Sequence, residues 1–165
     1  MIQDIGPREY DNHYTEQSPR AEDWLLIYRG EEVLLKYQDG SICYPRVREV
    51  ELADREVTYL FSISEERFFL LKSGLEEGLP GCVWEKPAVF RDARPRYLGF
   101  AGITGQQLNA WYRSNRFCGG CGAPMVPDHT ERMVRCERCG NLVYPKICPG
   151  VIVAVTDRNR LLLTK

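Results

Sequence analysis

The sequence has no long hydrophobic run and no apolar segment near its start. None of its apolar stretches approaches the ~20 residues that a membrane-spanning helix needs. Charged side chains recur from Asp4 to Arg20, and this pattern excludes a secretory signal at the start of the chain. These absences predict a protein with no membrane partner, for which a cytoplasmic location is the default.

Neither sign of charge dominates, and histidine is scarce. Lys and Arg total 22 against 23 Asp and Glu, so the net charge of −1 gives no global reason to bind nucleic acid. The two histidines, His13 and His129, form no pair that indicates catalysis. The acidic pairs 31–32, 65–66 and 76–77 lie beside turn signals, which is typical of solvated turns rather than of catalytic carboxylates.

The first hundred or so residues have the pattern of a β-rich domain. A chain of 165 residues that is 44% hydrophobic can form one globular domain with a small appendage. Residues up to Glu22 read as a loose arm or an irregular first strand, and 75–87 has too many Gly and Pro residues for a helix or strand. Between them, short aromatic and β-branched runs separated by turn residues predict an antiparallel sheet. These runs are 24–28, 33–37, 57–63 and 68–71.

Two short helical segments are expected after the strands. Thr104 followed by Gln107 is a capping-box signal, and the apolar residues within 108–112 share one helical face. We therefore predict a helix from about Gly105 to Ser114 that leads directly into a cysteine-rich segment. Residues 87–92 have the pattern of one short helical turn.

The end of the sequence has the pattern of a β-hairpin. Val151–Val155 and Leu161–Leu163 are apolar runs joined by the polar turn Asp157–Asn159. Because an isolated hairpin is only marginally stable, we expect this chain to be the front part of a longer protein.

The cysteines predict a metal site. Their number, seven, is odd, and without an export signal they are expected to stay reduced, which favours metal binding over disulfides. Cys118 and Cys121 form one pair and Cys136 and Cys139 a second, with residues 122–135 between the pairs. Two such knuckles supply the four thiolates of a tetrahedral zinc site. Because four thiolates leave no open position, the zinc is expected to be structural.

Three alternatives to zinc remain at this stage: two disulfides, a redox-active pair and an iron–sulfur cluster. His129 lies between the knuckles, but four ligands already fill the shell. Cys43, Cys82 and Cys148 have no partner at ligand spacing, and we interpret them as small buried or half-buried side chains.

The sequence around the cysteines carries a family resemblance. The run Ala110–Gly122, the second knuckle, Tyr144–Ile147 and the strand Val151–Val155 together resemble the NADH pyrophosphatase family of Nudix hydrolases. Asn115 stands where that family usually has histidine, and Lys146 where it usually has arginine. The close match covers residues 110–165. Residues 1–109 resemble the family only in having the pattern of a variable β-rich N-terminal domain.

The resemblance implies an α+β fold in three parts. Residues 1–109 would form the β-rich N-terminal domain, and 110–146 the end of a short helix followed by the four-cysteine zinc ribbon. Residues 147–165 would form the first hairpin of an incomplete Nudix α/β/α domain.

The implied activity is cleavage of the pyrophosphate of NADH or NAD to nicotinamide mononucleotide and AMP with Mg or Mn, and in bacterial relatives removal of an NAD cap from RNA. Nudix enzymes hold these ions with a glutamate cluster that includes an Arg-Glu pair. Arg-Glu occurs here at 8–9, 48–49 and 55–56, and none of the three begins a Nudix box. We therefore expect no catalytic residue in these 165 residues, no hydrolysis by this chain alone, and Mg or Mn only in the missing Nudix domain.

One substrate contact is implied by the resemblance. In the family an aromatic residue at the ribbon exit stacks on the ligand's base or nicotinamide across a homodimer, and Tyr144 occupies that position. The alternative is that Tyr144 only packs the ribbon against the next strand.

For the whole chain, the alternative is a non-enzymatic zinc ribbon that binds nucleic acid or dimerises. The ribbon's basic residues exceed its acidic ones by a small margin, Arg116, Arg132, Arg135, Arg138 and Lys146 against Asp128, Glu131 and Glu137.

Overall fold

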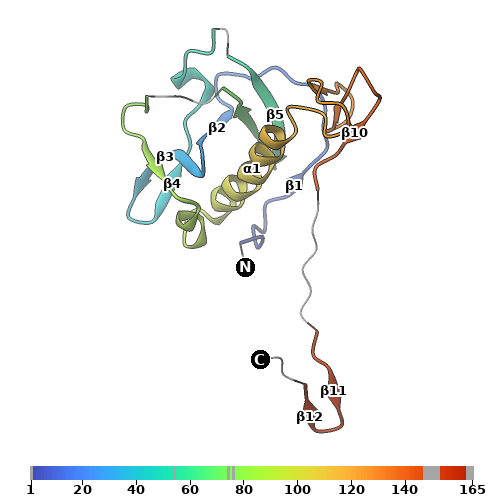
Figure 1. Ribbon diagram of the computed structural model, residues 1–165. Helices are drawn as coiled ribbons and strands as arrows, with labels where there is room; N and C mark the ends of the chain where they lie inside the picture. The colour runs from blue at the N-terminus through green and yellow to red at the C-terminus, as the bar shows by residue number, and fades with distance from the viewer. Residues whose placement is uncertain (1, 54, 74, 76, 147–152, 163–165) are drawn as a thin grey trace.

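The protein folds as a mixed seven-stranded sheet with one α-helix packed on it, followed by a small three-stranded ribbon and a two-stranded hairpin (Figure 1). The computed structural model describes residues 2–53, 55–73, 75, 77–146 and 153–162. The predicted α+β class, rich in β-structure, is confirmed.

The large sheet has the strand order β1-β5-β6-β2-β3-β4, and β7 also pairs with β3. All four predicted runs are strands. The short strands β4 and β7 were not predicted, and β7 lies in the segment that is rich in Gly and Pro. The strands are β1 (Tyr10–Asp11), β2 (Trp24–Arg29), β3 (Glu32–Gln38), β4 (Ser41–Cys43), β5 (Val57–Ile63), β6 (Glu66–Leu71) and β7 (Val83–Glu85).

The prediction of a purely antiparallel sheet is wrong, because β2 and β6 pair in parallel. After β4 the chain passes through the 3-10 helix η1 (Val47–Glu49) and returns as the β5–β6 hairpin, which joins the edge of β2 opposite β3. Side chains 24–28 are all buried, so β2 reads as a continuous apolar run, as expected for a central strand covered on both faces.

Two hydrophobic clusters lie on opposite faces of this sheet. Leu26 and Tyr28 belong to the cluster that also contains helix residues, whereas Leu25 and Ile27 belong to the other. This division follows from the two-residue period of a strand.

Helix α1 (Arg96–Ser114) covers one face of the sheet and begins nine residues earlier than predicted. Thr104 therefore lies inside the helix, and the predicted capping box is wrong. Gly99, Gly102 and Gly105 lie within α1 and let the helix lie close to the sheet. A Cβ at Gly105 would contact Leu26 and would lie 2.7 Å from Tyr28 Oη. The short helical turn is confirmed as the 3-10 helix η2 (Pro87–Arg91).

The C-terminal elements are small. The ribbon sheet has the order β10-β9-β8, with β8 (Val126–Pro127), β9 (Val134–Arg135) and β10 (Leu142–Val143). The final hairpin pairs β11 (Thr156–Asp157) with β12 (Arg160–Leu161). The prediction of a hairpin is confirmed, but its bounds are wrong: residues 153–155 are not in a strand, Asp157 belongs to β11 rather than to the turn, and residues 151, 152 and 163 lie outside the described residues. No helix among the described residues is long and apolar enough to cross a bilayer.

Candidate metal centre

The structure brings the four predicted cysteine thiols together at one point of the ribbon. All four Sγ atoms lie within 4.8 Å of one another. Across the two knuckles, Cys118 Sγ lies 3.5 Å from Cys139 Sγ, and Cys121 Sγ lies 3.4 Å from Cys136 Sγ. Zinc–sulfur bonds of about 2.3 Å in a tetrahedron place sulfurs roughly 3.8 Å apart, so the arrangement fits one zinc ion.

Each pair of cysteines lies in a tight turn that depends on glycine. Gly122 N donates to Cys118 O at 2.8 Å, and Gly140 N donates to Cys136 O at 2.9 Å. Both glycines have positive φ, +73° and +76°, which L-residues with side chains rarely adopt. The two knuckles therefore have the same backbone geometry and direct their thiols inward.

Backbone amides in the knuckles favour thiolates. The N–H groups of Gly120 and Cys121 lower the pKa of Cys118 to about 6. In the second knuckle, the backbone N–H groups of Cys139 and Arg138 lower the pKa of Cys136. The N–H of Ala123 acts in the same direction on Cys121, but hydrogen bonds with the other three thiols, first with Cys136, together with desolvation raise the pKa of Cys121 to about 12. A divalent cation at the centre stabilises all four thiolates and displaces the remaining protons.

The ribbon has almost no hydrophobic core of its own. Among its described residues, 115–146, the buried side chains are Cys118, Val134 and Cys136. Its three strands have two residues each. Such a small element needs an additional cross-link to stay folded, and a metal ion bound by the four thiols would provide it.

Comparison with known proteins agrees with this geometry. A family model described as the NADH pyrophosphatase zinc ribbon domain matches residues 113–144, the segment that holds all four thiols. The NAD-capped RNA hydrolase NudC of Stutzerimonas stutzeri strain A1501 is 30% identical over 151 residues, which are 88% of this chain and 52% of the relative. NudC of Pseudomonas putida strain KT2440 is 36% identical over 154 residues, 89% of this chain and 54% of the relative. The ribbon segment thus matches the zinc ribbon of the NADH pyrophosphatase family, and most of the chain is similar to these NudC relatives.

The similarity to this family of Nudix hydrolases extends well beyond residues 110–165. Alignments that cover 88% and 89% of the chain include much of the N-terminal sheet. The expectation that residues 1–109 resemble the family only as a β-rich domain is therefore too narrow. The chain spans about half the length of the curated relatives that it matches. The four thiols therefore lie where the matching zinc ribbon domain is expected to hold a structural zinc ion.

Arg132 ties the ribbon to the N-terminal sheet. Its Nη2 donates to the carbonyl oxygen of Leu60 in β5, and its guanidinium lies 5.0 Å from the centre of the Tyr14 ring. Tyr14 Oη in turn donates to Asp128 O at 3.4 Å. The sequence carries no signal for this contact, because it joins segments that are far apart in the chain.

Replacing Arg132 by alanine is expected to loosen the ribbon from the sheet without loss of zinc. Hydrogen bonds from charged groups contribute about 1.5–3 kcal/mol, and the Leu60 carbonyl would lose its partner. Hydrogen exchange of residues 126–135, measured together with zinc content, checks this. Arg135→Ala is the matched control, because Arg135 is exposed and lies 3.9 Å from Glu137. Equal exchange in both variants would contradict the anchoring role.

The other predicted residues lie apart from the thiols. Tyr144 is 49% exposed, and its Oη donates to Glu131 Oε2 at 2.7 Å. His129 Nδ1 lies 2.9 Å from Glu16 Oε2 rather than in the metal cluster. Cys43 and Cys82 are half-buried free thiols, as interpreted from the sequence, and Cys148 lies outside the described residues.

Proposed function

We propose that this chain is the N-terminal and zinc-ribbon portion of a Nudix hydrolase that cleaves the pyrophosphate of NADH or NAD, releasing AMP and the nicotinamide mononucleotide. NAD-capped RNA is a further proposed substrate. The observation that carries the proposal is the four-thiol cluster inside a segment that matches the NADH pyrophosphatase zinc ribbon. The NudC relatives, named as NAD-capped RNA hydrolases, support the RNA substrate.

In this proposal Cys118, Cys121, Cys136 and Cys139 bind one zinc ion whose role is structural. Four thiolates fill the tetrahedral shell, so the zinc has no position left for water or substrate. The proposed units are residues 1–109, the ribbon segment 110–146, and 147–165 as the start of the Nudix domain.

Catalysis is assigned to the part of the complete protein that this chain does not include. Pyrophosphate cleavage needs carboxylates that hold Mg or Mn, so that the ions neutralise the diphosphate and activate water. Among the described residues, the cysteines are the one group of three or more His, Cys, Asp or Glu side chains placed to hold an ion. The purified 165-residue chain is therefore expected not to hydrolyse NADH or NAD-capped RNA, whereas the complete protein with Mg or Mn hydrolyses both.

That comparison tests the proposal. Cleavage of NADH by the 165-residue chain, abolished by chelating Mg, would place the catalytic residues within it and overturn the assignment. A complete protein that leaves both substrates intact would favour the alternative of a non-enzymatic binding or dimerisation module.

Tyr144 is proposed as a substrate contact that stacks on the base or nicotinamide across a homodimer. Its half-exposed ring at the end of the ribbon supports this role, because a free aromatic face is available. The hydrogen bond from Tyr144 Oη to Glu131 fixes the position of the hydroxyl end of the ring.

Replacing Tyr144 by alanine in the complete enzyme is expected to raise the KM for NADH about tenfold, since base stacking contributes ~1–3 kcal/mol. Tyr144→Phe keeps the ring but loses the hydrogen bond to Glu131, so its KM should stay near that of the native enzyme. Steady-state kinetics of both variants checks this. An unchanged KM in the alanine variant would assign Tyr144 to packing instead, and a phenylalanine variant as impaired as the alanine variant would assign the effect to the hydrogen bond with Glu131.

A further inference from the structure

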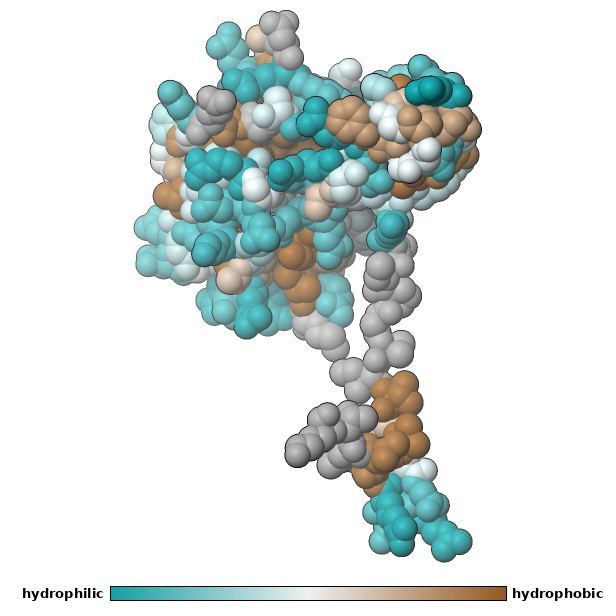
Figure 2. All heavy atoms as spheres, in the orientation of Figure 1, coloured by the Kyte–Doolittle hydropathy of each residue, from teal (hydrophilic) through white to brown (hydrophobic). Residues whose placement is uncertain are grey.

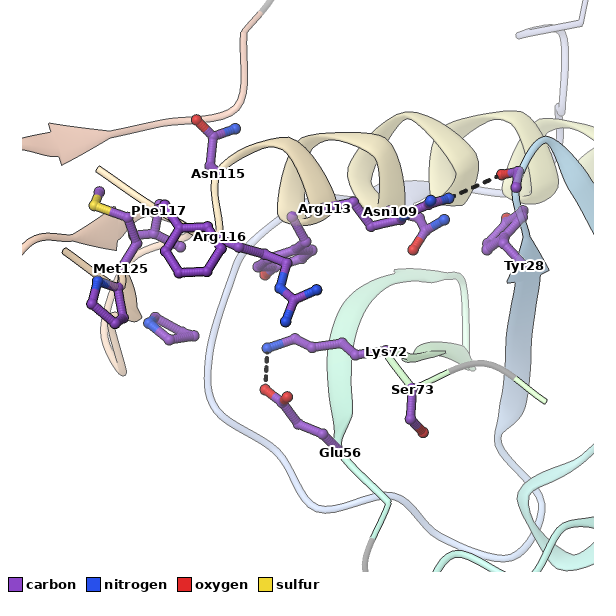
Figure 3. A pocket seen from close by; sticks show the side chains of 15 residues that line it. Tyr28, Glu56, Lys72, Ser73, Asn109, Arg113, Asn115, Arg116, Phe117 and Met125 are labelled. Atoms are coloured by element: carbon purple, nitrogen blue, oxygen red, sulfur yellow. Dashed lines mark hydrogen bonds and ion pairs between the residues drawn. The ribbon is translucent and has the colours of Figure 1, made fainter. Parts of the chain in front are cut away.

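A cleft of about 830 Å³ lies where the end of helix α1 meets the sheet and the ribbon (Figure 3). Lys72 and Tyr28 line it from the sheet domain, Asn109 and Arg113 from the helix, and Arg116 from the entry to the ribbon. Its volume is in the range of small-molecule sites in proteins. None of the four clustered cysteines lines this cleft, so it is separate from the candidate metal centre.

Asn109 is a little-exposed polar residue of this cleft, and its amide is available to a ligand. It is only 6% exposed, and none of the hydrogen bonds found among the described residues involves its side-chain amide. In Figure 3 the amide lies beneath the helix and faces the cleft. Among the described residues, the fully buried side-chain polar atoms without a partner are Trp111 Nε1 and Arg132 Nη1, so the Asn109 amide keeps contact with the solvent in the cleft. The amide is therefore free to bind a polar group that enters the cleft.

The cations around Asn109 are incompletely paired. Lys72 forms an ion pair of 2.5 Å with Glu56, the one carboxylate among the residues that line the cleft. Arg113 reaches only the carbonyl oxygen of Gly30, at 3.3 Å. Arg116 has an aromatic ring as its contact, 6.0 Å away. Figure 3 shows the ends of Arg116 and Lys72 directed toward the same space. Their summed field favours an anion there.

Aromatic rings complete the lining. Phe117, which follows Arg116, is 61% exposed, and Tyr112 lies on the helix next to Arg113. Exposed rings can stack on a planar base, an asparagine amide can pair with a base edge that has a donor beside an acceptor, and arginine binds phosphate. Asn109 and Arg113 are four residues apart on one helical face, so base and phosphate contacts lie side by side.

We propose that this cleft binds a nucleotide, with the base near Asn109 and the phosphate near Arg113 and Arg116. The nucleotide is either free or one unit of an RNA strand, since both present the same chemistry. This proposal goes beyond the hydrolytic function. It uses only described residues of this chain, and binding requires no hydrolysis, so its failure would leave the proposed activity untouched.

Calorimetric titration of the zinc-loaded 165-residue chain tests the proposal. AMP is expected to bind at least tenfold more tightly than ribose 5-phosphate or adenosine, because each of these lacks one of the two recognised groups. A 5′-phosphorylated octaribonucleotide that binds at least tenfold more tightly than AMP would identify RNA as the source, and equal affinity would identify the free nucleotide. No binding of either probe would overturn the proposal.

Two variants locate the site. Arg116→Gln is expected to weaken binding about tenfold, whereas Arg91→Gln, an exposed arginine in η2 outside the cleft, should leave it unchanged. Asn109→Leu removes the amide that would pair with the base edge, so it should weaken AMP binding at least tenfold. Equal binding by the Arg116 and Arg91 variants would overturn the assignment. So would native affinity in the Asn109 variant.

Discussion

A Cys136→Ser variant is expected to lose its zinc and, with it, the folded structure of the ribbon. Cys136 is 1% exposed, and its sulfur is one of the four gathered thiols. Serine is a poor ligand for zinc, and structural zinc sites contribute about 10–16 kcal/mol of apparent binding free energy. The described part of the ribbon buries too few side chains to stay folded without that contribution.

The N-terminal sheet should remain folded in the same variant. Its two hydrophobic clusters are formed by residues of the sheet, the helix and their connections, with none from the ribbon. Two-dimensional NMR is therefore expected to show collapsed amide signals for 118–143 beside dispersed signals for β2 and β6, with zinc below about 0.1 equivalents. Cys82→Ser, which changes a half-buried free thiol in the sheet domain, is the control and should keep its zinc. Dispersed ribbon signals in the Cys136 variant would contradict the account.

Gly102→Ala is expected to destabilise the protein by about 3 kcal/mol, although alanine normally favours a helix over glycine by ~1 kcal/mol. A Cβ at Gly102 would overlap Tyr44 Oη and the ring of Phe90, both of which are buried. Neither ring is free to move, because Tyr44 Oη also donates to Leu98 O at 2.8 Å and Phe90 is part of the packed core. The helix must therefore move away from the sheet.

Urea unfolding followed by far-ultraviolet circular dichroism measures this change, and the Tm should fall by roughly 6–12 °C. Gly119→Ala is the control, because a Cβ there meets nothing within 4 Å and its φ is not positive. A Gly102→Ala variant as stable as the native protein would show that the helix does not lie as close to the sheet as the structure indicates.

Local patterns were enough to predict much of the N-terminal domain. The four longer strands were predicted because runs of aromatic and β-branched residues report strand structure directly. The parallel pairing of β2 with β6 was missed, since it depends on how a distant hairpin returns to the sheet. The first half of α1 was missed for a related reason: glycines that disfavour an isolated helix are required by its packing against Tyr44 and Phe90.

The candidate sites also differ in how far the sequence alone predicts them. The four thiols were predicted from spacing alone, because both ligands of a knuckle come from one short segment. Arg132 and Asn109 carried no signal, since their importance comes from what the fold places around them. The cleft proposed to bind a nucleotide is formed by segments from Tyr28 to Val134, so it exists only in the folded chain.

The most direct test of the account is X-ray absorption at the zinc edge on protein purified without added metal. Four thiols within 4.8 Å of one another predict about one zinc per chain with four sulfur neighbours at ~2.3 Å. A spectrum with nitrogen or oxygen neighbours, or a sample without zinc, would contradict the claim that these cysteines hold the ribbon together.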